Sequence, residues 1–145
     1  IEWPVVVMLA AMIPVGQALE TSGISLNIAN FISSSTAGMA LPWLILMVLV
    51  ITMFVSDIVN NAATAVIMAP IAANLAIQVG QPVEPFLMAV AVGASCAFLS
   101  PIGHQCNTLV MAPGNYKFGD YWRLGLPLEC VIVAISIPMI LFVWT

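Results

Sequence analysis

The chain has 145 residues, of which 63% are hydrophobic and only 6% are charged, with a formal net charge of −4 at pH 7. Soluble domains carry roughly a quarter charged residues, so this composition excludes a soluble globular protein and indicates an all-α integral membrane chain. Only two side chains are Lys or Arg, which argues against nucleic acid as a partner. The three cysteines lie in or beside apolar runs and are expected to pack as small hydrophobic residues.

The first two segments differ in kind. Residues 3–19 form an apolar run of 17 residues, just enough to cross about 30 Å of hydrocarbon as a helix. The polar residues Thr21-Ser22-Gly23 end this run. Residues 24–38 mix apolar side chains with serines and asparagines, and they are too few and too polar to span. We therefore expect an amphipathic interfacial helix followed by a loop.

Two dense apolar runs, 41–55 and 62–77, flank the polar stretch 56–61. Joined as one helix, they would measure about 55 Å, nearly twice the thickness of the hydrocarbon. Each run alone, with 15 and 16 residues, is short for a comfortable crossing. These lengths predict a re-entrant helical hairpin that enters and leaves the membrane on one side, with its tip at residues 57–61.

The next apolar run, 86–99, follows a turn at 80–85 and stops at Ser100-Pro101. Proline lacks an N–H group and disfavours helical backbone at the residue before it. We therefore expect a broken transmembrane helix, unwound to about residue 107 and resumed as a short helix at 108–112.

The two basic residues, Lys117 and Arg123, lie in a predicted loop at 116–126 that also holds aromatic side chains. Short loops that carry positive charge are typically cytoplasmic. The run 127–144 is expected to be the last membrane span.

The two polar interruptions predict the functional site. Hydrocarbon offers no water to polar groups, so such breaks persist only against protein or a wet cavity, and two of them suggest one site of a secondary transporter. The amide oxygens of Asn60, Asn61 and Asn107 suit a hard cation such as sodium. The free N–H groups near Ala62 and Thr108 suit an anion. The alternative is that these residues only cap broken helices.

Two titratable residues lie in the same stretches. Asp57, interpreted as the only acid inside the apolar pattern, could carry a proton, bind a cation or sit solvated at the hairpin tip. His104 could titrate near neutral pH, donate a hydrogen bond to substrate or be an ordinary loop residue. The chain has no zinc-ligand spacing and no G-x-S-x-G nucleophile motif, so an enzyme is not expected.

The segment Asn60-Asn61-Ala62-Ala63-Thr64-Ala65, followed by Met68-Ala69-Pro70-Ile71, resembles the second "SNTAT…PI" signature of the divalent anion:sodium symporter family. This family comprises the sodium:sulfate and citrate-transporter-like permeases. Ser100-Pro101-Ile102-Gly103 and residues 116–127 are similar to the broken helix and exit loop that follow the signature. The resemblance covers essentially the whole chain. Asn60 and Ala62 depart from it, because the signature has Ser and Thr at those positions.

The resemblance implies a secondary active transporter of small anions, of the dicarboxylate, citrate or sulfate class, coupled to sodium or protons in the cell membrane. Family members have two inverted repeats and typically form homodimers that work by an elevator motion. Residues 1–145 would then be one multi-pass transport module, the second repeat, from which the N-terminal repeat is missing. Sodium, the only cofactor implied, would bind Ser56, the Val59 carbonyl, Asn61 and the Gly103 backbone.

By the same resemblance, the anionic substrate would contact Asn60-Asn61-Ala62 at the hairpin tip. A competing hypothesis is a membrane anchor or assembly subunit, in which the polar breaks are only caps. Convergence of polar side chains from the two interruptions would favour transport, and scattered or lipid-facing asparagines would favour the anchor.

Overall fold

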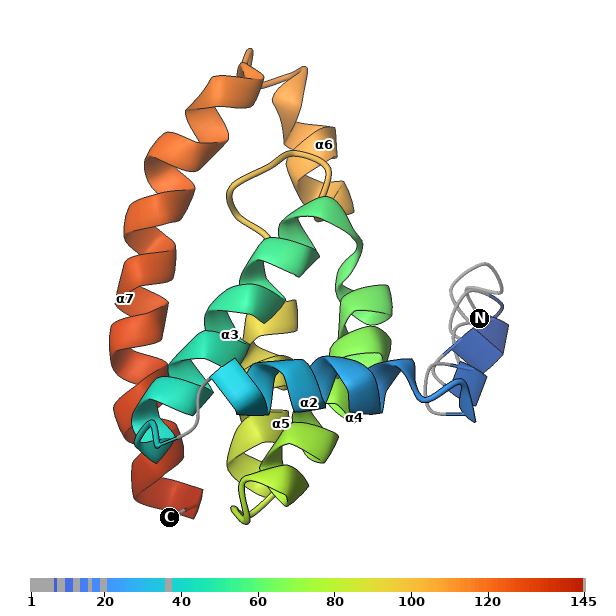
Figure 1. Ribbon diagram of the computed structural model, residues 1–145. Coiled ribbons are helices and arrows are strands. Elements are labelled where there is room, and N and C mark those ends of the chain that lie inside the picture. The colour runs from blue at the N-terminus through green and yellow to red at the C-terminus, as the bar shows by residue number, and fades with distance from the viewer. Residues whose placement is uncertain are drawn as a thin grey trace.

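The structure is a computed structural model that describes residues 7, 10–11, 14–15, 17–18, 21–35 and 38–144. The helices with defined bounds are α2 (Ile24–Ser35), α3 (Leu41–Ile58), α4 (Asn61–Gln78), α5 (Glu84–Ala94), α6 (Gln105–Met111) and α7 (Phe118–Trp144), and the described part contains no strand (Figure 1). Three of them, α3, α4 and α7, are long and apolar enough to cross a membrane. The all-α membrane class is confirmed, whereas the predicted span 3–19 lies mostly outside the described residues.

Helices α3 and α4 are joined by only Val59 and Asn60, and Figure 1 shows the chain turning back at this link. Each helix has 18 residues, more than the 15 and 16 counted from apolar runs, because the polar residues of the interruption are themselves helical. An 18-residue helix is about 27 Å long, close to the hydrocarbon thickness. Length alone therefore does not require re-entry, and the re-entrant hairpin stays a prediction.

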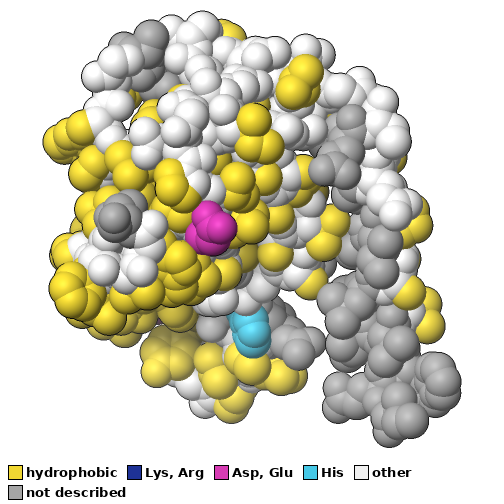
Figure 2. Space-filling view, turned by 90° about the horizontal axis from the view of Figure 1, so that it is seen from below, with side chains coloured by type: hydrophobic (Ala, Val, Ile, Leu, Met, Phe, Trp, Pro, Cys, Tyr) yellow, Lys and Arg dark blue, Asp and Glu magenta, His cyan; other side chains and the backbone are white. Residues whose placement is uncertain are grey.

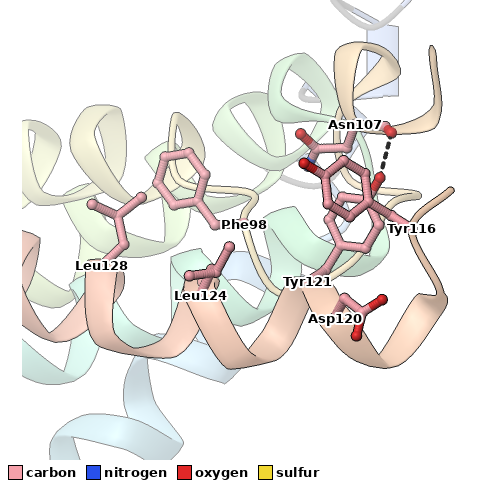
Figure 3. A pocket seen from close by; sticks show the side chains of 8 residues that line it. Phe98, Asn107, Tyr116, Asp120, Tyr121, Leu124 and Leu128 are labelled. Atoms are coloured by element: carbon pink, nitrogen blue, oxygen red, sulfur yellow. Dashed lines mark hydrogen bonds between the residues drawn. The ribbon is translucent and has the colours of Figure 1, made fainter. Parts of the chain in front are cut away.

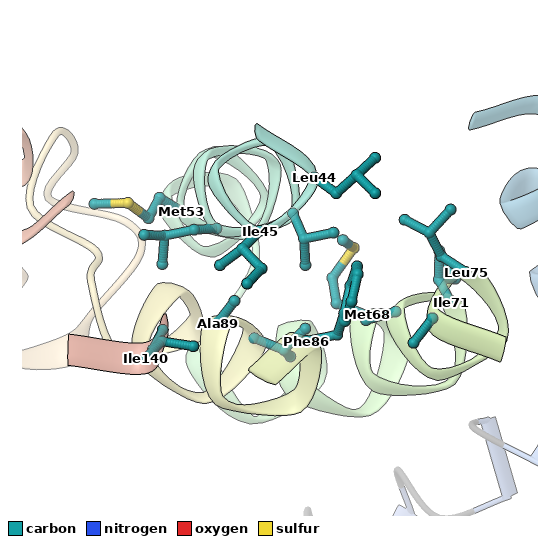
Figure 4. Packing of buried hydrophobic residues seen from close by; sticks show 14 of the residues in the cluster. Leu44, Ile45, Met53, Met68, Ile71, Leu75, Phe86, Ala89 and Ile140 are labelled. Atoms are coloured by element: carbon teal, nitrogen blue, oxygen red, sulfur yellow. The ribbon is translucent and has the colours of Figure 1, made fainter. Parts of the chain in front are cut away.

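The core forms where α5 packs between α3 and α4 (Figure 4). Phe86, at the start of α5, is fully buried against this cluster. Gly93 marks the closest approach of α5 to α3, since a Cβ there would lie 2.8 Å from Thr52 Cβ and 2.9 Å from the Leu49 carbonyl oxygen. Fully or almost fully buried hydrophobic residues in this core are Ile45, Leu49, Ala72, Leu75, Ala76, Phe86 and Ala89.

Helix α2 lies across α4 (Figure 1), and the predicted helix in this segment is confirmed. Its contact face is small and polar: Ser25 and Ala29 are buried, and Asn74 Nδ2 donates to Ser25 Oγ at 3.3 Å. The outer face is apolar, with Phe31 73% exposed. A helix that buries its small residues and exposes its large apolar ones suits a lipid environment better than water.

Three predicted boundaries are wrong. The short helix expected at 108–112 is α6, which begins at Gln105 and ends at Met111. Helix α5 ends at Ala94, not at residue 99, and the non-helical stretch runs from 95 to 104 before α6. Helix α7 begins at Phe118, so most of the predicted loop 116–126 is helical. Pro127 lies inside α7 and does not start it, because a membrane helix tolerates proline where other groups can satisfy the freed carbonyl.

Helix α7 is the most peripheral of the three long helices. Of the 18 most apolar consecutive residues of α7, only 6% are buried inside the structure. Leu124 and Phe142 of this helix are 77% and 88% exposed. Figure 2 shows hydrophobic side chains over much of the described surface seen from below. Such continuous apolar surface requires lipid or further protein to cover it.

Candidate functional site

Three oxygen atoms converge where α3 meets α4 and the end of α5. The hydroxyl of Ser56, which is fully buried, lies 3.0 Å from Asn61 Oδ1 and 2.8 Å from the carbonyl oxygen of Ala94. A hydroxyl has one proton, so it cannot serve both acceptors fully. The result is a compact, oxygen-rich point, of the kind that suits a hard cation.

Gly103 brings the non-helical stretch against the same point. A Cβ at this position would lie 2.7 Å from the Ser56 carbonyl oxygen and 3.0 Å from Asp57 Cα, so only glycine allows this approach. Val59 belongs to the link between α3 and α4, where its N–H donates to the Val55 carbonyl at 2.8 Å and caps α3. The structure thus gathers Ser56, Asn61 and Gly103, three of the residues predicted to hold sodium.

The neighbouring Asn60 has a capping role. Its Oδ1 accepts from the Ala63 N–H at 2.8 Å, so it is the N-cap of α4, while the residue itself is exposed. Asn60 and Asn61 are therefore adjacent in sequence but differ in environment. Ala62 lies in the first turn of α4 and is half-buried.

Side chains from other helices satisfy the backbone that α5 leaves unpaired. If α5 continued, the N–H groups of Phe98 and Leu99 would donate to the carbonyls of residues 94 and 95. Instead, the Ser56 hydroxyl donates to the Ala94 carbonyl, and the Leu99 N–H donates to Asp57 Oδ1 at 2.9 Å. These replacements explain why α5 ends five residues earlier than its apolar run.

Two side chains of α6 bind further backbone groups of the non-helical stretch. Asn107 Nδ2 donates to the carbonyls of Ala97 and Ser100 at 2.8 and 3.1 Å, and Thr108 Oγ1 donates to the Pro101 carbonyl at 2.6 Å. These two predicted substrate residues are thus occupied with fixing the shape of the stretch. Ser100 adds to the link with α3, because its Oγ donates to the Asp57 carbonyl at 2.6 Å.

His104 is the N-cap of α6, where its Nδ1 accepts from the Cys106 N–H at 3.2 Å. The sequence left three interpretations of His104 open, and this geometry corresponds to the third, a loop residue with a local structural role. Asp57 is different, because it is 6% exposed and its second carboxylate oxygen, Oδ2, is buried without a hydrogen-bond partner.

The interpretation of Asp57 as the only interior acid is wrong, because Glu129 lies within α7 and has a buried oxygen, Oε1, that also lacks a partner. Its carboxylate interacts electrostatically with the Phe98 backbone and with Asp57. An acid inside the apolar run 127–144 was the available sequence signal.

A cavity of about 200 Å³ lies between α6, α7 and the non-helical stretch (Figure 3). Tyr121 closes one side by donating from its hydroxyl to the Asn107 carbonyl at 2.7 Å, and its ring meets Tyr116 edge to face. The lining is mostly aromatic and aliphatic: Phe98, Asn107, Tyr116, Asp120, Tyr121, Leu124, Gly125 and Leu128.

Comparison with known proteins identifies the relatives of this chain. A family model described as "citrate transporter" matches residues 1–93 and 40–145. A Synechocystis protein named only as an uncharacterized transporter is 38% identical over 140 residues, or 97% of this chain and 23% of that protein. A probable sodium/sulfate cotransporter of Chlamydomonas reinhardtii is 33% identical over 94% of the chain and 15% of its own length.

A third relative is the sodium-dependent high-affinity dicarboxylate transporter 3 of Caenorhabditis elegans. It is 31% identical over 137 residues, or 92% of this chain and 24% of that protein. The chain spans a quarter or less of the length of these relatives.

Proposed function

The chain belongs to the citrate transporter family, a multi-pass membrane family, and we propose that it is part of a secondary active transporter that moves a small anion together with sodium. The family resemblance seen in the sequence is thereby confirmed. Relatives named as sodium/sulfate and sodium-dependent dicarboxylate transporters support an anion of the dicarboxylate, citrate or sulfate class.

The observation that carries this proposal is the convergence at Ser56. Its hydroxyl, Asn61 Oδ1 and the Ala94 carbonyl oxygen come from three different helices and meet within hydrogen-bond distance. We propose that sodium binds here to Ser56, Asn61, the Val59 carbonyl and the backbone at Gly103. Neutral oxygens held by rigid helix ends supply the ligands that such an ion requires.

The anion is proposed to bind next to the ion, at the α4 N-terminus formed by Asn60-Asn61-Ala62. Asn60 is exposed there, and first-turn N–H groups together with the helix dipole favour negative charge. Asn107 and Thr108 would act on the substrate site through the backbone that they hold in place.

We further propose that the chain is the second inverted repeat of a longer permease that forms homodimers. In this arrangement α3 and α4 are the re-entrant hairpin, and α5 with α6 is the broken transmembrane helix. The exposed apolar face of α7 supports the proposal, since it offers a large surface to lipid or to another repeat.

The alternative is a non-transporting anchor or assembly module. The capping roles of Asn60 and His104 favour it, because both residues would be needed to cap the N-termini of α4 and α6 even without any transport. Capping accounts for the bond from the Ser56 hydroxyl to the Ala94 carbonyl but not for Asn61 Oδ1 at 3.0 Å from the same hydroxyl, which is why transport is the preferred function.

Uptake by the intact protein in proteoliposomes tests the proposal. An inward sodium gradient should drive accumulation of labelled sulfate, citrate or succinate above that seen with an equal potassium gradient. Protein-free vesicles give the baseline. Uptake at the baseline for all three anions, from protein that is folded by gel filtration and circular dichroism, would leave the anchor module as the better account.

A further inference from the structure

One face of α7 is pressed against the non-helical stretch. Tyr121, Gly125 and Glu129 follow at intervals of four residues and so share a helix face. Tyr121 donates to the Asn107 carbonyl, and a Cβ on Gly125 would lie 2.5 Å from the Phe98 carbonyl oxygen. In Figure 3, Tyr121 and Leu124 of α7 lie beside Asn107 and Phe98. The third residue of the face, Glu129, lies close enough to the Phe98 backbone and to Asp57 to interact with both electrostatically.

Asp57 of α3 binds the next peptide of the same stretch. Its Oδ1 accepts from the Leu99 N–H at 2.9 Å. The same Leu99 nitrogen lies against α7, since a Cβ on Gly125, one turn before Glu129, would be 3.1 Å from it. This arrangement places both acids at one point of the fold and explains why they interact electrostatically.

Each of these carboxylates has an oxygen without a partner. Asp57 Oδ2 and Glu129 Oε1 are buried and make no hydrogen bond. The only basic side chains of the chain, Lys117 and Arg123, are both exposed at the start of α7. Burying two like charges without compensation is costly, so a positive charge between them would stabilise this packing strongly.

We propose that Asp57 and Glu129 together form a second cation-binding position, for an alkali ion such as sodium, beside the oxygens at Ser56 and Asn61. The inference deepens the proposed function, on which it rests for the identity of the ion. Carboxylate oxygens are hard ligands, which favours a hard cation over a transition metal that prefers nitrogen or sulfur. Carbonyl oxygens or water would complete the ligands.

The consequence is a link between ion binding and the position of α7. A cation held by both carboxylates bridges α3, the non-helical stretch and α7, which otherwise meet through few polar contacts. Its loss would leave two like charges facing each other and would loosen α7 from the stretch. The second cation would therefore stabilise the arrangement that shapes the first site.

Sodium binding to the intact protein in detergent, measured with radioactive sodium and without any anion, tests this position separately from transport. Glu129→Gln keeps a polar side chain of the same size but removes the charge, whereas Glu129→Leu removes both the polarity and the charge. We expect Glu129→Gln to lose one bound sodium per chain or to weaken one binding step by about tenfold or more. Glu84→Gln, which alters an exposed acid at the start of α5, should match the parent.

Three outcomes would overturn the proposal. Glu129→Gln could bind sodium like the parent while only Glu129→Leu is impaired, which would make Glu129 a positioning residue alone. Glu129→Gln could change the pH profile of uptake and leave sodium binding unchanged, which would indicate that the two carboxylates bind a proton and not a cation. If neither variant is recovered folded, crystals of the parent protein can be soaked with thallium. An anomalous peak between the two carboxylates would support the site. Thallium bound elsewhere, with no peak between the carboxylates, would refute it.

Discussion

The two interruptions of the helices are built differently. The α3–α4 link has two residues and is satisfied locally, by the Asn60 cap and by the Val59 N–H. The stretch 95–104 has ten residues, side chains of α3 and α6 bind its backbone, and α7 packs against it at Gly125. A local cap survives changes elsewhere, whereas a shape held from three helices responds to each of them. The longer stretch is therefore the part of the site that can couple ion binding to helix movement.

Gly103→Ala should give the largest effect, because it breaks the contact between the two interruptions. The added Cβ would meet the Ser56 carbonyl at 2.7 Å, and the stretch would have to move away from α3. Displacements of about 1 Å can cost on the order of 100-fold in rate, and we expect a loss of that size in sodium-driven uptake. Gly119→Ala is the matched control, since nothing lies within 4 Å of a Cβ there. Equal loss in both variants would contradict the role of the close approach.

Asn107→Ala should affect the long stretch alone. It removes the donors to the Ala97 and Ser100 carbonyls, and stranded backbone acceptors cost about 1–3 kcal/mol. Thermal or chemical unfolding of the purified protein should show this loss of stability. The exposed Asn30→Ala on α2 serves as control and should be near neutral. A neutral Asn107→Ala would mean that the stretch is held mainly by its hydrogen bonds with Asp57 of α3.

Asn60→Ala should have the smallest effect, because it removes a local cap. Loss of an N-cap costs about 1 kcal/mol, and Asn60→Ser should restore most of it. The sodium concentration for half-maximal uptake should stay the same, while the KM for the anion should rise, because Asn60 belongs to the proposed anion site. A changed sodium requirement in Asn60→Ala would contradict the separation between capping and ion binding.

The amino-acid sequence alone predicted those parts of the fold that depend on the local pattern of apolar and polar residues. Apolar runs bounded by polar residues predicted helices near α3, α4 and α7, and the tip at 57–61 contains the link found at Val59 and Asn60. The same pattern missed the end of α5, because Ser56 and Asp57 replace bonds that local sequence assigns to the helix itself. Partners that are distant in sequence cannot be found from local periodicity.

Glu129 was missed for a related reason. One acid near the start of an apolar run has the same appearance as an ordinary helix end, and only the packing of Gly125 against Phe98 shows that this part of α7 faces the site. Asn60 and Asn61 were predicted as site residues, but the sequence could not separate their roles. Their residue type is identical, and only the fold distinguishes the cap from the residue that contacts Ser56.

The central claim is that the oxygens at Ser56 and Asn61 form a sodium site, and the sodium titration of Asn61→Ala tests it most directly. Sodium-dependent anion uptake should be measured for the parent, for Asn61→Ala and for Asn60→Ala at equal amounts of folded protein. We predict that Asn61→Ala abolishes coupled uptake or raises the half-saturating sodium concentration by about tenfold or more, while Asn60→Ala keeps the value of the parent. An Asn61→Ala protein with the sodium dependence of the parent would contradict the account.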